Sequence, residues 1–443
     1  MVALAVPMLN SLNTCRESAE STAVLNRFAS ETASAVFPAA VGPTTTITYL
    51  FINDMEFLEM DSVIFSEDKG FQYFYRIIQS VMLDIVIVAG ARPNFVKIAP
   101  LIHKLLREEK INYTLVHTGQ HYDPLMNDVF FEDLSIPAPS YHLGISGGSQ
   151  NKQTSEIITG FEEFLKDSNA KAVIVVGDVT STMACSIVTK KLHRDLIHIE
   201  AGLRSHDRAM PEEINRILTD SITDYFFTTS REAGANLVKE GIADDRIFFV
   251  GNIMIDSLVR TLPFIQRPEV YRTYSLEENN YYLLTLHRAD NVDNADVLTD
   301  ILRAVSESIG DRTCIFPVHP RTEKMLRGTS IFHEIKNIEF IEPLRYLEFL
   351  FMQKHAKAVI TDSGGIQEET TFMNVPCVTY RTTTERPETI TTGSNELAQD
   401  LPALKAFLNT LEAGEWKTSS IPPLWDGNTA GRIVQKLHAI YSI

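Results

Sequence analysis

The stretch that decides the fold is residues 172–204, AVIVVGDVTSTMACSIVTKKLHRDLIHIEAGLR. Its apolar run Ala172–Val176 predicts a buried strand, and a helical pattern follows over about residues 181–192. A second apolar run, residues 196–199, predicts another strand. Strand, helix and strand in this order form a βαβ unit, and the same alternation along the chain predicts an α/β fold with mostly parallel sheets.

An acidic residue follows each of these two strands: Asp178 follows the first and Glu200 the second. Ligands of parallel sheets bind in the crevice outside the carboxyl ends of the strands. The two carboxylates are therefore candidates for an acid/base pair. A structural alternative is that Asp178 caps the following helix and Glu200 pairs with Arg204.

Composition narrows the class of protein. The chain has 443 residues, enough for two or three domains, and its formal net charge is −17. Strong acidity argues against a general nucleic-acid surface. Apolar runs stay well short of the roughly 18–20 residues of a membrane span, so we expect no membrane partner. The 4 cysteines form no CxxC pair, which favours reduced thiols and a cytoplasmic location.

The chain falls into three regions. Residues 1–81 contain no motif, and we expect an N-terminal extension, an independent appendage or translated upstream sequence. A first β/α set begins near residue 83 and a second at residue 281, joined by a charged, proline-containing connection over 263–280. Two doubly wound lobes are therefore predicted.

The first strand, residues 83–89, leads into GARPNFVK, and a helix is predicted over residues 96–109. Arg92 and Lys97 flank the start of this helix, where anions are favoured. Neither a dinucleotide fingerprint nor a P-loop is present. Further along, Pro211 starts a helix with Glu212 in its first turn. Glu212 is a third candidate acid, or else a dipole or salt-bridge partner of Arg216 four residues later.

In the second half, Ser363-Gly364-Gly365 lies between a predicted strand and a predicted helix. Without side chains, the two glycines let a ligand approach, and first-turn N–H groups with the Ser363 hydroxyl become donors. This geometry suits a diphosphate; the alternative is a plain tight turn.

Four more residues complete the predicted second-half site. Glu369 would accept from a ribose hydroxyl and Arg386 would pair with phosphate. Phe349 would stack on a base or belong to the core. His287 ends a strand and would assist a leaving phosphate. No HxH or HExxH spacing occurs there, so no metal site is predicted.

Together these motifs resemble the non-hydrolysing UDP-N-acetylglucosamine 2-epimerases over residues 82–443. The matching pieces are GARPNFVKIAPL, HTGQHYD, VGDVTST, HIEAGLRSHDRAMPEEINR, GNIMIDSL, TLHRADNVD, FPVHPR, TDSGGIQEE and TTTERPE. The resemblance implies a glycosyltransferase-B-like fold of two Rossmann-like domains with the substrate in the cleft. It gives an N-terminal domain of residues 82–260 plus 427–443 and a UDP-binding domain of 261–426. Asn94 stands where many relatives have an acidic residue.

The resemblance also implies a reaction: reversible epimerisation of UDP-GlcNAc to UDP-ManNAc at C2. UDP leaves by anti elimination to give 2-acetamidoglucal and then adds back, with no cofactor or metal. The implied catalytic residues are Asp178, Glu200, Glu212 and His287. The implied substrate-binding residues are Arg92, Lys97, Phe349, Ser363, Gly364, Gly365, Glu369 and Arg386.

Alternatives on the same chemistry or fold remain open. They are a hydrolysing epimerase that releases ManNAc and UDP, an epimerase of a UDP-2,3-diacetamido-uronic acid, a glycosyltransferase, and a nucleotide-sugar-binding protein without catalysis. As partners we expect a UDP-sugar and a second copy of this chain, in a homodimer.

Overall fold

The computed structural model describes residues 82–119, 131, 134–318, 320–327 and 329–443. The predicted extension, residues 1–81, lies outside these ranges. Residues 83–443 form one compact unit with two sheets. Within the described ranges, no helix combines the length and apolar character needed to cross a bilayer.

The first sheet has strand order β3-β2-β1-β4-β5-β6-β7, and its paired strands run parallel. Its strands are β1 (Leu83–Ala89), β2 (Ile111–His117), β3 (Tyr141–His142), β4 (Ala172–Val176), β5 (Asp195–Ile199), β6 (Tyr225–Thr228) and β7 (Ile247–Phe249). The order reverses between β1 and β4, as in a Rossmann fold, and a ligand crevice is expected at that point.

Side chains alternate between two cores along β1. Ile85 and Ile87 pack against one set of helices, whereas Val86 and Val88 pack against another. The first set is α4 (Arg92–Leu105), α10 (Ile253–Thr261) and α20 (Thr429–Tyr441). The second set is α6 (Gln150–Lys166) and α7 (Thr180–Lys191), and α8 (Pro211–Ile222) packs against α7. Helix α9 (Arg231–Lys239) and the short 3-10 turn η1 (Asp244–Arg246) connect β6 to β7.

The second sheet repeats the pattern with the order β10-β9-β8-β11-β12-β13, again with parallel pairs. Its strands are β8 (Tyr281–Thr285), β9 (Thr313–Pro317), β10 (Ile338–Ile341), β11 (Ala358–Thr361), β12 (Cys377–Tyr380) and β13 (Asn395–Ala398). The order reverses between β8 and β11. The two sheets confirm the predicted α/β fold of paired Rossmann-like lobes.

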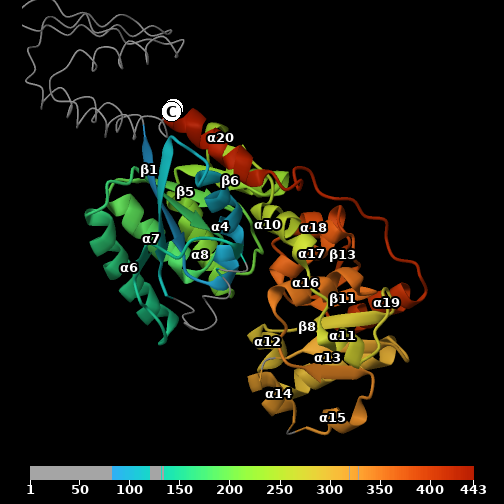
Figure 1. The fold of residues 1–443 in the computed structure, drawn as a ribbon. Helices are drawn as coiled ribbons and strands as arrows, with labels where there is room; N and C mark the ends of the chain where they lie inside the picture. The colour runs from blue at the N-terminus through green and yellow to red at the C-terminus, as the bar shows by residue number, and fades with distance from the viewer. Residues whose placement is uncertain (1–81, 120–130, 132–133, 319, 328) are drawn as a thin grey trace, which may run out of the picture. The chain divides into compact units, whose positions relative to one another are not determined.

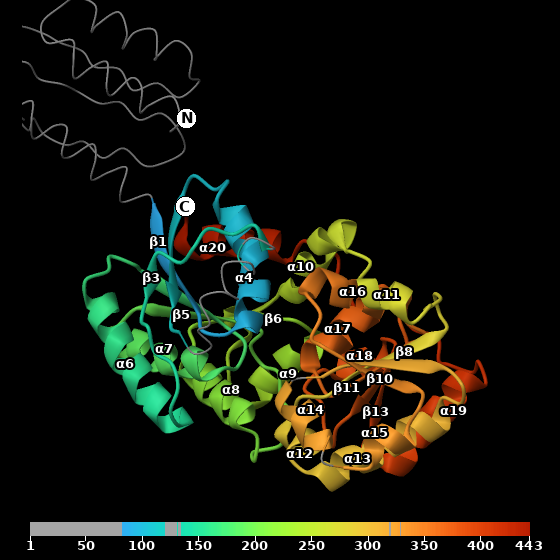
Figure 2. The same ribbon diagram turned by 60° about the horizontal axis from the view of Figure 1, so that its bottom comes forward.

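Helices cover both faces of the second sheet as well (Figure 2). One face carries α13 (Ala295–Ser308), α14 (Pro320–Leu326), α15 (Ile331–Glu334) and α19 (Leu401–Glu412). The other carries α11 (Glu269–Thr273), α16 (Tyr346–His355) and α17 (Gly364–Met373). The 3-10 turn η2 (Leu262–Phe264), α12 (Ala289–Val292) and α18 (Pro387–Thr391) complete the described helices.

We call β1–β7 with α4–α10 and α20 the first lobe, and β8–β13 with α11–α19 the second lobe. The chain crosses between the lobes twice, after α10 and again between α19 and α20, and α20 lies beside α4 (Figure 1). Asp256 anchors this returning helix, because its carboxylate accepts from the backbone N–H groups of Thr429 and Ala430 at 3.0 and 2.8 Å. Trp425 packs with Leu262 and Ile265 where the two crossings meet.

Two predicted elements were wrong in detail. The sequence pattern of residues 396–411 predicts one helix, but the structure has the edge strand β13 there, followed by α19. Asp400 caps α19 by accepting from the Ala403 N–H at 2.8 Å, and Pro402 lies in its first turn, so the helix cannot extend backwards. Helix α4 begins at Arg92, four residues earlier than predicted, because Pro93 sits in its first turn.

Candidate active site

The carboxyl ends of four central strands carry the motifs singled out in the sequence. Gly177-Asp178 follows β4 and Glu200 follows β5 in the first lobe. His287 lies just beyond β8, and Asp362-Ser363 follows β11 in the second lobe. Both pairs of strands lie at or beside the point where the strand order of their sheet reverses.

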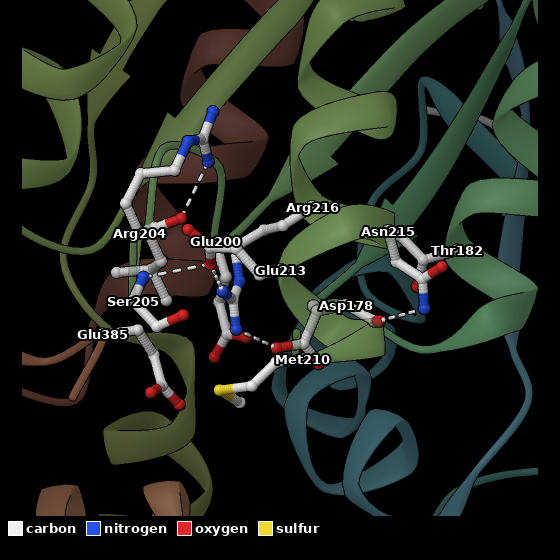
Figure 3. Close-up of polar contacts among 12 residues, drawn as sticks. Asp178, Thr182, Glu200, Arg204, Ser205, Met210, Glu213, Asn215, Arg216 and Glu385 are labelled. Atoms are coloured by element: carbon white, nitrogen blue, oxygen red, sulfur yellow. Dashed lines mark hydrogen bonds and ion pairs between the residues drawn. The ribbon is translucent and has the colours of Figure 1, made fainter. Parts of the chain in front are cut away.

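Asp178 forms an ion pair with a buried arginine of α8. The Arg216 Nη2 lies 2.5 Å from Asp178 Oδ2, and the Asn215 side chain donates to the Asp178 carbonyl at 2.9 Å (Figure 3). Helix α7 is capped at Val179 without a side-chain hydrogen bond, so the capping alternative for Asp178 is wrong. Burial opposes ionisation, but Arg216 and Lys97 hold the pKa of Asp178 below its ordinary value. Asp178 is therefore a carboxylate at neutral pH.

Glu200 pairs with Lys97 across the first lobe, at 2.5 Å between Oε2 and Nζ. The alternative pairing with Arg204 is wrong, because Arg204 binds Asp220 and Glu240. The other Glu200 oxygen, Oε1, is buried and accepts no hydrogen bond from the described residues. Burial would lower the pKa of Lys97, but the charges of Glu200 and Asp178 raise it, so the ammonium stays protonated.

The backbone of Glu200 is strained. Its φ is +69°, in the left-handed region that a glutamate rarely adopts. Such strain costs about 1–3 kcal/mol and concentrates at functional sites. The unpartnered Oε1 and the strained backbone together make Glu200 a candidate functional group.

The two glutamates at the start of α8 have different environments. Glu212 is exposed, whereas Glu213 is buried and accepts from the backbone N–H groups of Ser205 and His206 at 3.0 and 2.9 Å. Glu213 also bonds Arg216, so the predicted pairing of Arg216 with Glu212 is replaced by one with Glu213 and Asp178. Glu213 was not predicted as a site residue. Its only signal in the sequence is its place next to Glu212 in the segment Pro211-Glu212-Glu213.

The negative charge of Glu212 acts on Arg288 of the second lobe. Burial and the charge of Arg381 lower the pKa of Arg288, while the negative charges of Glu385, Asp362 and Glu212 oppose that shift. The charge of Glu212 in the first lobe therefore acts on the second-lobe loop that carries His287.

His198, also missed from the sequence, supports the Gly177-Asp178 turn. Its Nδ1 lies 2.6 Å from Asp220 Oδ1 and its Nε2 lies 2.9 Å from the Gly177 carbonyl oxygen. Burial disfavours an ionised Asp220, but His198 and Arg204 hold its pKa below the ordinary value. Both ring nitrogens thus contact oxygen atoms, and the buried ring bridges Asp220 and the Gly177 carbonyl.

Asn94 lies in the first turn of α4. Its Oδ1 accepts from the Gly90 and Ala91 N–H groups at 3.2 and 3.1 Å, and its Nδ2 donates to the Val176 carbonyl at 3.1 Å. A carboxylate could not make the last bond. The amide thus ties the start of α4 to the end of β4, next to Asp178.

The glycine pair of the second lobe makes room for neighbouring side chains. A Cβ on Gly364 would lie 2.5 Å from Arg386 Nη1, and one on Gly365 would lie 3.1 Å from Met254 Cε. The Ser363 side chain accepts no capping bond, so it does not occupy the N-terminus of α17. The first N–H groups of a helix have no acceptor within the helix, so the start of α17 can bind an anion.

Arg386 is a buried cation beside the glycines. It binds Glu368 Oε1 at 2.7 Å and also Glu385, which in turn binds Arg381 at 2.8 Å. These carboxylates raise the pKa of Arg386 well above its ordinary value despite its burial. The charge of Glu385 also acts on Arg216 of the first lobe, so charges of alternating sign link the lobes.

The remaining predicted residues lie on or next to α16 and α17, or at the start of α4. Glu369 is buried and accepts from Gln353 at 2.8 Å and Tyr346 at 3.2 Å, and burial raises its pKa to about 7. Phe349 is half-buried and packs against the apolar cluster under α16.

The side chain of Arg92 lies outside the described part of the chain. Among the described residues, no His, Cys, Asp and Glu side chains gather as a metal site.

Glu388, just after Arg386, gives a testable pH dependence. Both its carboxylate oxygens are buried and accept no hydrogen bond from another described residue, and burial raises its pKa from 4.5 to about 7. The folded chain therefore binds this proton more tightly than the unfolded chain, so stability falls as pH rises from about 4.5 to about 7. That shift corresponds to about 3 kcal/mol.

We expect Glu388→Gln to remove this fall, so that the variant is more stable than the unchanged protein at pH 8. Denaturant unfolding of both proteins at pH 5 and pH 8 measures the difference, and the comparison cancels the similar contribution of Glu369. A variant less stable than the unchanged protein at pH 8 would contradict the prediction.

Comparison with known proteins identifies the family of this chain. A family model described as UDP-N-acetylglucosamine 2-epimerase matches residues 103–438. The UDP-N-acetylglucosamine 2-epimerase of Methanocaldococcus jannaschii is 40% identical over 364 residues, covering 79% of this chain and 98% of that protein. The chain belongs to the UDP-N-acetylglucosamine 2-epimerase family.

The family inferred from the motifs is thus confirmed, and solved epimerases share the fold. The crystal structure of the M. jannaschii epimerase in complex with UDP-GlcNAc and UDP is 39% identical, with a TM-score of 0.72, and covers 81% of this chain and 100% of that one. A second epimerase, the UDP-2,3-diacetamido-2,3-dideoxy-D-glucuronate 2-epimerase of Pseudomonas aeruginosa, is 38% identical over 318 residues, 71% of this chain and 88% of that protein.

Proposed function

We propose that this member of the epimerase family interconverts UDP-GlcNAc and UDP-ManNAc at C2. One observation carries the proposal: ionised acids at the strand ends of the first lobe lie within electrostatic reach of the cationic Arg386 beside the glycine pair of the second lobe. Such a site can remove a proton from a sugar while it stabilises a departing diphosphate.

The proposed reaction is an anti elimination followed by re-addition. A base removes the C2 proton as the C1–O bond breaks, and the bonding pair leaves with UDP to give 2-acetamidoglucal. UDP then adds back to C1 while a proton is delivered to the other face of C2. We assign Asp178, Glu200 and Glu212 as the acids and bases at C2, because Asp178 is ionised, Glu200 has an unpartnered oxygen and the charge of Glu212 acts on the loop that carries His287.

The leaving diphosphate needs positive charge and N–H donors. We assign these to His287, to Lys97 and Arg386, and to the Ser363-Gly364-Gly365 start of α17. In the structure, Lys97 and Arg386 each pair with a carboxylate. A bound diphosphate would therefore share their positive charge with these carboxylates. We further assign Arg92 to the phosphates, Glu369 to the ribose and Phe349 to the uracil face.

We also propose the wider organisation of the enzyme. Residues 1–81 would be an extension outside the catalytic unit, with an N-terminal domain of 82–260 plus 427–443 and a UDP-binding domain of 261–426. The packing of α20 on α4 supports the discontinuous first domain. The enzyme would act as a cytoplasmic homodimer that requires no cofactor and supplies UDP-ManNAc for polysaccharide synthesis.

Incubation with UDP-GlcNAc in deuterated water, followed by NMR, tests the proposal. We expect UDP-ManNAc, with deuterium at C2 of both epimers, because the proton is exchanged while glucal and UDP are bound. Free ManNAc with UDP would indicate a hydrolysing enzyme instead. Conversion of only a UDP-2,3-diacetamido-uronic acid would change the substrate, and sugar transfer to an acceptor without C2 exchange would overturn epimerisation.

A further inference from the structure

We infer that Asp362 is the positioning residue of His287, which it orients toward the leaving diphosphate. Asp362 follows β11, directly before Ser363, and its carboxylate is fully buried. The His287 Nδ1 lies 2.9 Å from its Oδ1. The ring itself is 60% exposed, so one nitrogen is fixed against the protein while the other edge faces outward.

The same carboxylate anchors the whole loop after β8. It accepts from the backbone N–H groups of His287, at 3.1 Å, and Arg288, at 3.0 Å, and from the Asn291 side chain at 2.9 Å. The Arg288 Nε also donates to the Asp362 carbonyl at 2.9 Å. One side chain at the reversal point of the second sheet therefore sets both the path of the loop and the angle of the ring.

The carboxylate of Asp362 determines which ring nitrogen of His287 carries a hydrogen. Burial favours a neutral Asp362, but the hydrogen bonds from His287 and Asn291 hold its pKa below the ordinary value, so it is a carboxylate. A carboxylate only accepts, which means that Nδ1 of His287 carries a hydrogen in every protonation state. Nε2 is then the nitrogen that can reach a ligand, and Asp362 stabilises the imidazolium whose Nε2–H would donate to the diphosphate.

Other charges act on this loop from both lobes. Arg288 follows His287 in the chain. The charges of Arg381 and Glu385 in the second lobe and of Glu212 in the first act on its pKa. None of these replaces Asp362 as the acceptor at Nδ1. This inference rests on the proposed function, because the diphosphate is the ligand for which Nε2–H is held.

The test is the pH profile of Asp362→Asn, with Asn291→Ala as the control. Asn keeps an acceptor for the backbone N–H groups but loses the charge that favours the imidazolium. We expect kcat to fall by about thirtyfold, by analogy with the loss of about ten- to a hundredfold when the partner that orients a metal-binding histidine is removed. The basic limb of kcat/KM should move to lower pH. Asn291→Ala removes a bond to the same carboxylate but not the ring contact, so its profile should keep the original limbs.

Two further measurements keep the inference falsifiable. On a His287→Asn background, Asp362→Asn should have almost no further effect on kcat; an equal loss on both backgrounds would show a purely structural role and overturn the inference. In the unchanged protein, long-range ¹H–¹⁵N spectra should show His287 as the Nδ1–H tautomer when neutral, whether or not the variant folds. An Nε2–H tautomer would overturn the inference, whereas absence of epimerisation by the unchanged protein would overturn the proposed function alone.

Discussion

Replacing Asp178 by asparagine is expected to lower kcat for UDP-GlcNAc by at least about a hundredfold, the lower end for a group that transfers a proton. The change removes a carboxylate that Arg216 and Lys97 keep ionised and leaves a side chain of the same shape. Arg216 keeps its second partner, Glu213, so the site should remain folded. Initial rates of UDP-ManNAc formation and the rate of deuterium incorporation at C2 measure the loss.

A matched control makes that result interpretable. Asp300→Asn is the same chemical change on an exposed face of α13, and its kcat should equal that of the unchanged protein. Binding of UDP by calorimetry should be almost unaffected in both variants, since Asp178 is assigned to the sugar and not to the nucleotide. Turnover near normal in Asp178→Asn would remove this residue from the proton transfer and leave Glu200 and Glu212 as the groups at C2.

The second large effect is expected on stability. Arg216 lies buried between Asp178 and Glu213, and Arg216→Met would leave both carboxylates without their shared cation. Removing one partner of a buried ion pair costs about 3–5 kcal/mol, because the remaining charge cannot return to water. Denaturant unfolding at pH 7 should show a loss of this size.

Two comparison variants separate charge from geometry. Arg216→Lys keeps a positive charge but cannot bridge two carboxylates with separate N–H groups, so its loss should be intermediate. Arg303→Met breaks an exposed pair with Glu334 and should leave the unfolding midpoint unchanged. If Arg216→Met were as stable as the unchanged protein, the buried cluster would not depend on this cation.

Sequence alone predicted the strands and their alternation with helices well, because buried parallel strands are short apolar runs that end at polar residues. The strand Ala172–Val176 has the predicted bounds, and the strand Ala358–Thr361 precedes Ser363-Gly364-Gly365 as predicted. The edge strand β13 was missed, since NELA lacks an apolar run and is a strand only through its pairing with β12.

The candidate site was predicted by residue type but not by partner. Glu213, His198 and Asp362 were missed, because each forms its bonds to a segment distant in the sequence or to backbone N–H groups. Several basic residues lie near Glu200 in the chain or the fold, and only tertiary packing decides that Lys97 is the one it binds. The spacing of residues along the chain does not show which basic residue Glu200 binds.

The double crossing between the lobes limits how the enzyme can move. A body tied at two neighbouring points swings most easily about the line through them, and twisting about other axes would stretch one tie. Trp425, Leu262 and Ile265 pack at these ties, so the pivot is an apolar joint. Opening to admit a nucleotide sugar would then follow a single arc that returns Arg386 and Glu385 to the same positions opposite Asp178 at every turnover.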